Sequence, residues 1–183
     1  MNGRFITSEQ RTEAGRLDAR FFALLEAIDN TGSINFRRIA MKTTARNQFA
    51  GTIDAIDTGP VTTQVSVTIA GGQQIVATMT TSAATRLKLA VGKEAIALIK
   101  SSAVVLVVDF AGYVLSARNQ FAGTISRLER GAVSSLVVLA LPGGVNLTAS
   151  VTNDAVDALA LAVGQQATAV FKAYSVMVAI AAA

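Results

Sequence analysis

Four positively charged side chains stand at matching positions in two parts of the sequence. Arg46 and Lys100 recur as Arg118 and Lys172, and both pairs are separated by the same step of 72 residues. Guanidinium and ammonium groups only donate hydrogen bonds, so they suit a ligand that only accepts them. Because charged residues make up only 15% of the chain, this recurrence predicts a binding site for a small oxyanion.

Hydroxyl groups recur at the same step. Thr44 and Ser116 precede the two arginines, and Thr80 and Thr152 stand where a short helix is expected to begin. Hydroxyls and the free backbone N–H groups at a helix start can all donate to an anion. A structural alternative stays open, in which Thr80 and Thr152 only cap their helices and Arg46 is a surface charge.

Catalysis and metal coordination through side chains are not expected. The sequence has no Cys, His or Trp, which excludes disulfides, thiolate zinc sites and imidazole acid–base chemistry. No acidic residue recurs unchanged, and Asp57 against Glu129 is the one near match. We therefore expect no enzyme and no metal ion held by protein side chains.

The recurring residues belong to a tandem repeat. Residues 45–53 return letter for letter as 117–125, and Gly71-Gly72 falls on Gly143-Gly144 without a gap. Such fidelity predicts one small unit duplicated in tandem. A unit of about 70 residues barely sustains its own core, so the copies are expected to pack on each other or on other chains. The expected parts are an N-terminal segment, 1–42, a first domain, 44–113, and a second domain, 116–183.

Each copy has the pattern of a strand-rich unit with one short helix. Apolar residues alternate with polar ones in several short runs, and the paired glycines predict a hairpin turn. Five strands with one helix indicate a mainly β fold of two tandem OB-like five-stranded barrels. The expected strands are 48–56, 61–70, 73–79, 95–100 and 103–108, the last closing the first unit, then 123–128, 133–141, 147–151, 167–171 and 176–180. The expected helices run from Thr80 to Leu89 and from Thr152 or Asn153 to Leu161.

Four further recurring positions are interpreted as structural. Phe49 is expected to lie in the core, and Gly51 where two chain segments pack closely. The amides of Asn47-Gln48 are expected to satisfy backbone groups at the start of a strand.

The N-terminal segment carries a helix signal. Thr7 is an expected N-cap with Gln10 at the capping-box position. Apolar residues between Leu17 and Ile28 fall on one helical face. This face is expected either to pack on its own domain or to form a dimer.

The composition indicates an oligomer. Hydrophobic residues make up 51% of the 183 residues, so few charges remain to cover a monomer surface. No uninterrupted apolar stretch has membrane-spanning length and no signal-peptide core is evident, so a soluble cytoplasmic protein is expected. The net charge of +4 is mild, and no basic run or aromatic platform predicts nucleic-acid binding by the repeats.

Short motifs at the ends of both copies resemble a known family. Thr44-Ala-Arg-Asn-Gln and Ser116-Ala-Arg-Asn-Gln resemble the opening signature of the molybdopterin-binding-protein-like (Mop) domain, and Lys100-Ser-Ser-Ala-Val and Lys172-Ala-Tyr-Ser-Val resemble its closing strand. The likeness covers residues 44–180 in two copies, a di-Mop arrangement. It implies OB-like barrels that exchange strands, with molybdate or tungstate as ligand at interfaces between barrels.

The resemblance also implies how the site is built. One wall would come from the opening signature, a second from the helix start, and the closing Lys strand of a facing unit would complete it. The implied oxyanion-binding residues are Thr44, Arg46, Thr80, Ser82, Arg86, Lys100 and Ser101, with Ser116, Arg118, Thr152 and Lys172 in the second copy. The second copy departs at Asp154, Ala158 and Ala173, so the first is expected to be the better donor unless Asp154 caps the start of its own helix.

Residues 4–29 resemble the end of the winged-helix domain and the dimer helix of ModE-type molybdate-responsive repressors. This likeness implies the effector-sensing, dimerising part of a molybdate-dependent transcriptional regulator. The alternative is a cytoplasmic molybdate store, for which a homotrimer replaces the homodimer. Since no recognition helix precedes the segment in this sequence, we expect no DNA binding by this chain alone.

Overall fold

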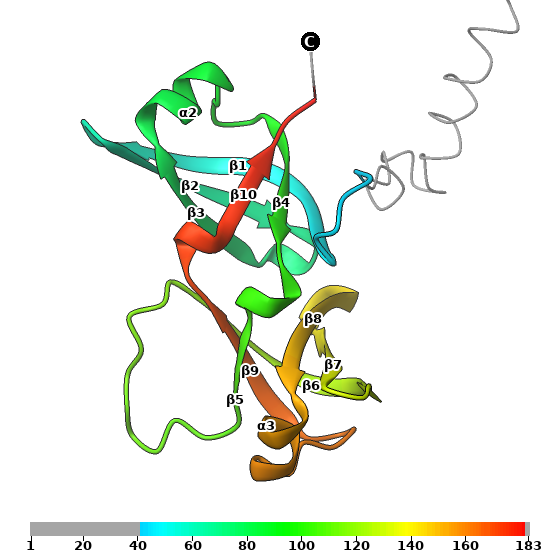
Figure 1. The fold of residues 1–183 in the computed structure, drawn as a ribbon. Coiled ribbons are helices and arrows are strands. Elements are labelled where there is room, and N and C mark those ends of the chain that lie inside the picture. The colour runs from blue at the N-terminus through cyan, green and yellow to red at the C-terminus, as the bar shows by residue number, and fades with distance from the viewer. Residues whose placement is uncertain (1–40, 182–183) are drawn as a thin grey trace, which may run out of the picture. The chain divides into compact units, whose positions relative to one another are not determined.

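The computed structural model describes residues 41–181, and the helix expected between Thr7 and Ile28 lies outside them. The described residues are mostly β-strand, arranged in two five-stranded sheets (Figure 1). This arrangement confirms the expected mainly β fold of two OB-like barrels.

The two repeats form the same elements in the same order. The first repeat contains β1 (Asn47–Thr58), β2 (Thr62–Ile69), β3 (Gln74–Thr80), α2 (Thr81–Arg86), β4 (Glu94–Ile99) and β5 (Val105–Val107). The second contains β6 (Asn119–Arg130), β7 (Ser134–Leu141), β8 (Val145–Thr152), α3 (Asn153–Ala158), β9 (Gln166–Phe171) and β10 (Val176–Ala179). The order of strands is β10-β4-β1-β2-β3 in one sheet and β5-β9-β6-β7-β8 in the other.

The fifth strand of each barrel comes from the other repeat. Strand β5 pairs antiparallel with β9, with Val105 opposite Val170, and β10 pairs with β4, with Val176 opposite Ile99. The prediction that 103–108 closes its own unit was therefore wrong, and the strand exchange implied by the Mop resemblance is present. A short 3-10 turn, Ser101–Ala103, precedes β5. An exchanged strand makes the same ladder of hydrogen bonds as a native one, so a local pattern does not reveal which sheet receives it.

The long first strand of each repeat serves two neighbours. The first half of β1 pairs with β4 and its second half with β2, and the register shifts between Ile53 and Ala55. A bulge of this kind bends a strand, which lets one strand turn from one side of a barrel to the other. Strand β6 has the same shift between Ile125 and Arg127.

One cluster of buried side chains runs through both barrels. Inward positions of β2 alternate along the strand, so Val65 and Val67 are fully buried while their neighbours are not. The same cluster contains Ile125 and Leu139 of the second repeat. Two units too small to sustain separate cores thus share one.

The turns follow the glycine pattern. Gly71 and Gly143 adopt φ angles of 80° and 77°, in the region that favours glycine, and each reverses the chain between two strands as expected. The helices are shorter than predicted, because Lys88 and Ala160 turn to positive φ (49° and 46°) and stop them at Arg86 and Ala158.

An ion pair joins α3 to the end of β6. The corresponding positions of the first repeat are threonines, so this repeat has no such pair. Two guanidinium nitrogens of Arg130 donate to the two carboxylate oxygens of Asp157, at 2.6 and 2.7 Å. The hydrogen bond from Arg130 holds the pKa of Asp157 below its ordinary value of 3.8.

We expect this pair to make stability depend on pH. Because the pKa of Asp157 is lower in the folded state, its contribution is present above the unfolded pKa and is lost as the pH falls through the folded one. Asp157→Asn should lower the urea midpoint slightly at neutral pH and leave it unchanged in strong acid. Since both groups are exposed, high salt should also shrink the difference. If the urea midpoints of Asp157→Asn and the wild type still differ in strong acid, the ion pair is not the cause of the difference.

Candidate oxyanion-binding site

Two pockets are each lined by both repeats. The first, which we call the Ser116 pocket, has a volume of about 460 Å³. Its lining residues from the second repeat are Ser116, Ala117, Arg118, Lys172, Ala173 and Tyr174, and those from the first are Asp57, Gly59, Thr62, Gln64 and Thr78.

The second pocket, which we call the Thr44 pocket, has a volume of about 550 Å³. Its lining residues from the first repeat are Thr43, Thr44, Ala45, Arg46 and Gln48, and those from the second are Arg127, Leu136, Val138 and Thr148. The opening signature of each repeat thus faces the strands of the other.

Strand register explains why distant residues meet in the Ser116 pocket. In the antiparallel pair β6·β9, Asn119 at the start of one strand lies opposite Phe171 at the end of the other. The residue before Asn119 is Arg118, and the residue after Phe171 is Lys172, so both lie at one end of the barrel. Asn47 opposite Ile99 brings Arg46 and Lys100 to the matching end of the first barrel.

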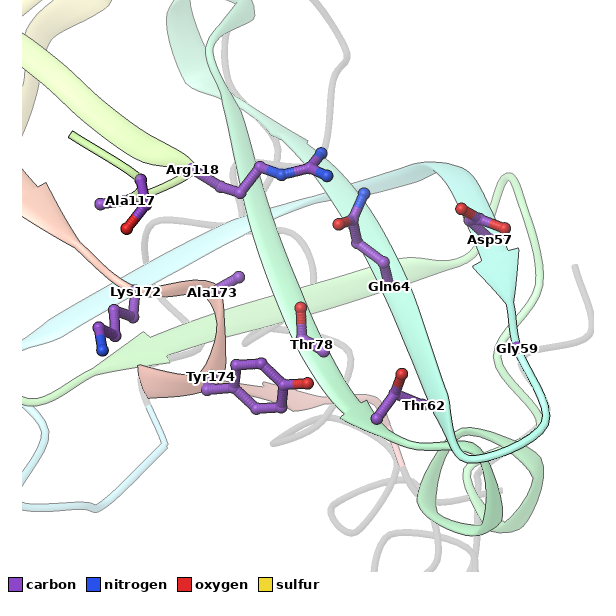
Figure 2. Close-up of a pocket in the computed structure, with 11 residues that line it drawn as sticks. Asp57, Gly59, Thr62, Gln64, Thr78, Ala117, Arg118, Lys172, Ala173 and Tyr174 are labelled. Atoms are coloured by element: carbon purple, nitrogen blue, oxygen red, sulfur yellow. The ribbon is translucent and has the colours of Figure 1, made fainter. Parts of the chain in front are cut away.

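The two cations of the Ser116 pocket extend in different directions. Figure 2 shows the Arg118 guanidinium extending toward Gln64, while the Lys172 ammonium points away from both. The hydroxyls of Thr78 and Tyr174 lie on the same side as Gln64. Ser116, Arg118 and Lys172 therefore line one pocket, but the charged ends of the arginine and the lysine lie apart.

The predicted cations are available for a ligand. Arg46, Lys100, Arg118 and Lys172 are all exposed, and within residues 41–181 none of them has a side-chain hydrogen bond or an ion pair. A cation without a carboxylate partner has hydrogen-bond donors free, and no nearby negative charge offsets its attraction for an anion.

The helix-start residues lie elsewhere. The hydroxyls of Thr80 and Thr152 accept from the backbone N–H of Ala83 and Ala155, at 3.3 and 3.2 Å, so both residues are N-caps. The Thr80 hydroxyl also lies 3.2 Å from that of Ser82. None of these residues lines either pocket, and the same holds for Arg86, Lys100 and Ser101. Their part in a site stays a prediction.

Two lining residues were missed by the sequence analysis. Gln64 lies on the wall opposite Arg118, and Arg127 adds a second guanidinium to the Thr44 pocket, 3.1 Å from Glu129. Their counterparts in the other repeat are Leu136 and Ala55. Because neither residue recurs, the repeat held no signal for them.

Residues 41–181 contain neither a candidate metal site nor a helix that could span a membrane. No group of three or more acidic, His or Cys side chains could hold a metal ion there. Over the same residues, no helix is long and apolar enough to cross a membrane.

Two OB-like barrels that exchange strands, with donor-lined pockets between them, define a class of tandem β-barrel modules. A family model described as "TOBE domain" matches residues 43–106 and 115–178, and this chain belongs to that family. The Mop resemblance seen in the sequence is thereby confirmed.

Two bacterial proteins are similar to this chain over most of its length. The chain is 79% identical over 144 residues to the molybdenum transport protein ModE of Herbaspirillum seropedicae, covering 79% of this chain and 54% of that protein. It is 31% identical over 170 residues to the molybdenum-pterin-binding protein MopB of Rhodobacter capsulatus, covering 91% of this chain and 63% of MopB. The chain spans about half the length of the ModE relatives.

A solved structure is similar over its whole length. The cytoplasmic molybdate-binding protein ModG, with molybdate bound, matches with a TM-score of 0.75 and 43% identity, covering 77% of this chain and all of ModG.

Proposed function

We propose that this chain binds molybdate at the ends of its barrels, where the opening signature and the closing lysine meet. One observation carries the proposal: Lys172 lines one pocket with Ser116 and Arg118, which lie far from it in the sequence. Within residues 41–181, neither the arginine nor the lysine has an ion-pair partner. The molybdate held by ModG supports the identity of the ligand.

The donor set suits a tetrahedral dianion. Molybdate offers only acceptor oxygens, and hydroxyls, a guanidinium and an ammonium supply donors and charge. Tungstate has the same shape and charge, so we propose that it binds nearly as well. Sulfate carries the same charge in a smaller volume, and the size of the site would discriminate against it.

We propose that a second copy of the chain completes each site. The Lys172 ammonium points away from Arg118 and Gln64, and the N-cap Thr80 with Ser82 and Arg86 lines neither pocket. In a homo-oligomer, the helix start of one copy would meet the lysine of another, as the resemblance implies. We propose a homodimer, with a homotrimer as the alternative.

The biological role has two candidates. The ModE relatives favour the effector-sensing and dimerising part of a cytoplasmic molybdate-dependent transcriptional regulator. We propose that DNA reading belongs to the part of those relatives that this chain does not match. ModG favours the alternative, a store, because the likeness covers all of that protein.

Native mass spectrometry with and without molybdate separates these roles. A sensor dimer should carry about one oxyanion per chain, whereas a trimeric store should carry more. Absence of any bound oxyanion at saturating molybdate would contradict the proposed function.

Molybdate should also raise the thermal stability of the protein. A ligand that binds only the folded state stabilises it by about 2.7 kcal/mol at a concentration 100 times the Kd. The measurement is the melting temperature by circular dichroism across a molybdate series, with sulfate at equal ionic strength as control. An identical shift with both anions would indicate a salt effect and would count against the proposal.

A further inference from the structure

The side chains of two buried asparagines form hydrogen bonds to backbone groups of the other repeat. Asn47 is 2% exposed and Asn119 is 1% exposed. The Asn47 amide donates to the Thr148 carbonyl at 2.8 Å and accepts from the Thr148 N–H at 2.7 Å. The Asn119 amide does the same with Val76, both distances being 2.8 Å. We refer to each set of two hydrogen bonds as an asparagine bridge.

The chemistry of the bridge requires an amide. Strands β3 and β8 end the order of strands in their sheets, so one side of each has no neighbouring strand in that order. An asparagine side chain carries one carbonyl and one N–H₂ group, and it can pair with a strand edge as another peptide group would. A carboxylate would keep the acceptor and lose the donor, and it would bury a charge.

Each bridge joins the two walls of one pocket. Asn47 follows Arg46 directly, and its partner Thr148 itself lines the Thr44 pocket. Asn119 follows Arg118, and its partner Val76 stands two residues before Thr78 on β3, which lines the Ser116 pocket. Residues two apart on a strand share a face of the sheet, so Val76 and Thr78 lie on the same face of β3. The bridge from Asn119 to Val76 therefore sets the position along β3 that Arg118 faces.

We propose that Asn47 and Asn119 are positioning residues, each of which holds the donors of one pocket in register against the opposite repeat. This inference rests on the proposed oxyanion binding. An anion site depends on donors held within a narrow geometry, so releasing one wall should cost affinity even where the barrels stay folded. Because each bridge serves one pocket, its loss should affect one site and spare the other.

Calorimetric titration of the full chain with molybdate tests this. Asn47→Asp and Asn119→Asp should each weaken one class of sites about tenfold or more, the loss expected for one misplaced donor to a charged ligand, and the double variant should weaken both. Asn146→Asp is the matched control, since Asn146 is exposed on β8, two residues before Thr148, and gains the same charge. Its affinity should equal that of the wild type.

A second pair of variants guards against misfolding. Asn47→Gln and Asn119→Gln keep both hydrogen-bonding atoms and lengthen the side chain by one carbon, so they shift the walls without burying a charge. They should weaken the same sites, with a smaller fall in the unfolding midpoint of the ligand-free protein.

The outcomes are distinguishable. Wild-type protein that binds no molybdate would overturn the proposed function, and this inference with it. Wild-type protein that binds, with folded Asp or Gln variants of unchanged affinity, would overturn the inference alone. A lower unfolding midpoint with unchanged affinity would show that the bridges serve only the fold, and would overturn it as well.

Discussion

The double variant Lys100→Ala, Lys172→Ala should bind molybdate about 10- to 100-fold more weakly than the wild type. In the proposed site each lysine would supply one hydrogen bond from a charged donor, and such a bond contributes about 1.5 to 3 kcal/mol. Both side chains are exposed and have no partner within residues 41–181. Their removal should therefore leave the unfolding midpoint and the circular-dichroism spectrum almost unchanged.

The control for this experiment removes the same charge elsewhere. Lys88 and Lys93 lie in the chain between α2 and β4, and the Lys93 ammonium bonds to the Lys88 carbonyl at 2.9 Å. The double variant Lys88→Ala, Lys93→Ala has the same net charge as the test variant, and neither residue lines a pocket. If both variants bind equally weakly, net charge alone governs affinity. Wild-type affinity in the test variant would remove the lysines from the site.

Gly143→Ala should destabilise the protein by about 2 to 4 kcal/mol. A Cβ at this position would lie 2.3 Å from the Gly71 Cα, so the turns of the two repeats would have to separate. The φ angle of 77° adds a penalty of about 1 kcal/mol for any residue with a Cβ. Overpacking against backbone, which does not yield as a side chain does, adds about 1 to 3 kcal/mol.

Gly72→Ala separates the two causes. Gly72 also has a positive φ, 75°, but a Cβ there would meet nothing within 4 Å. It should therefore lose only the conformational penalty, about 1 kcal/mol. Urea unfolding of both variants gives the comparison. Equal losses would show that the contact between Gly71 and Gly143 is not constrained as the structure has it.

Much of the fold was readable from local pattern. Paired glycines and alternating apolar residues predicted the turn at Gly71 and the strand that follows Val61, because both depend on neighbours in sequence. Gly51 was interpreted as a close-packing position, and a Cβ there would lie 2.3 Å from the Thr68 carbonyl oxygen. Each of these patterns occurs in both copies of the repeat, so each prediction had two occurrences to support it.

The strand pairings between the two repeats could not be predicted from local sequence patterns. The alternation of 103–108 suits either sheet, so the exchange of β5 came from family resemblance alone. The amide of Asn47 was expected at a strand start, but its partner Thr148 lies in the other repeat. No local sequence signal names a partner at that distance.

Contacts within one repeat were also easier to predict than contacts between chains at the candidate site. Ser116, Arg118 and Lys172 meet because β6 and β9 pair, and a strand pairing within one repeat follows from the fold class. Thr80 lines neither pocket, and the part proposed for it depends on contacts with another chain, which a single sequence does not specify.

The exchange of β5 and β10 has a consequence for synthesis on the ribosome. Strands β1 to β4 emerge early, yet the first barrel lacks its fifth strand until Val176–Ala179 have been translated. Meanwhile the edge of β4 is open to the same strand from a neighbouring nascent chain. The covalent tether between the repeats holds the chain's own strand at a high effective concentration, which favours closure within one molecule over entanglement of two.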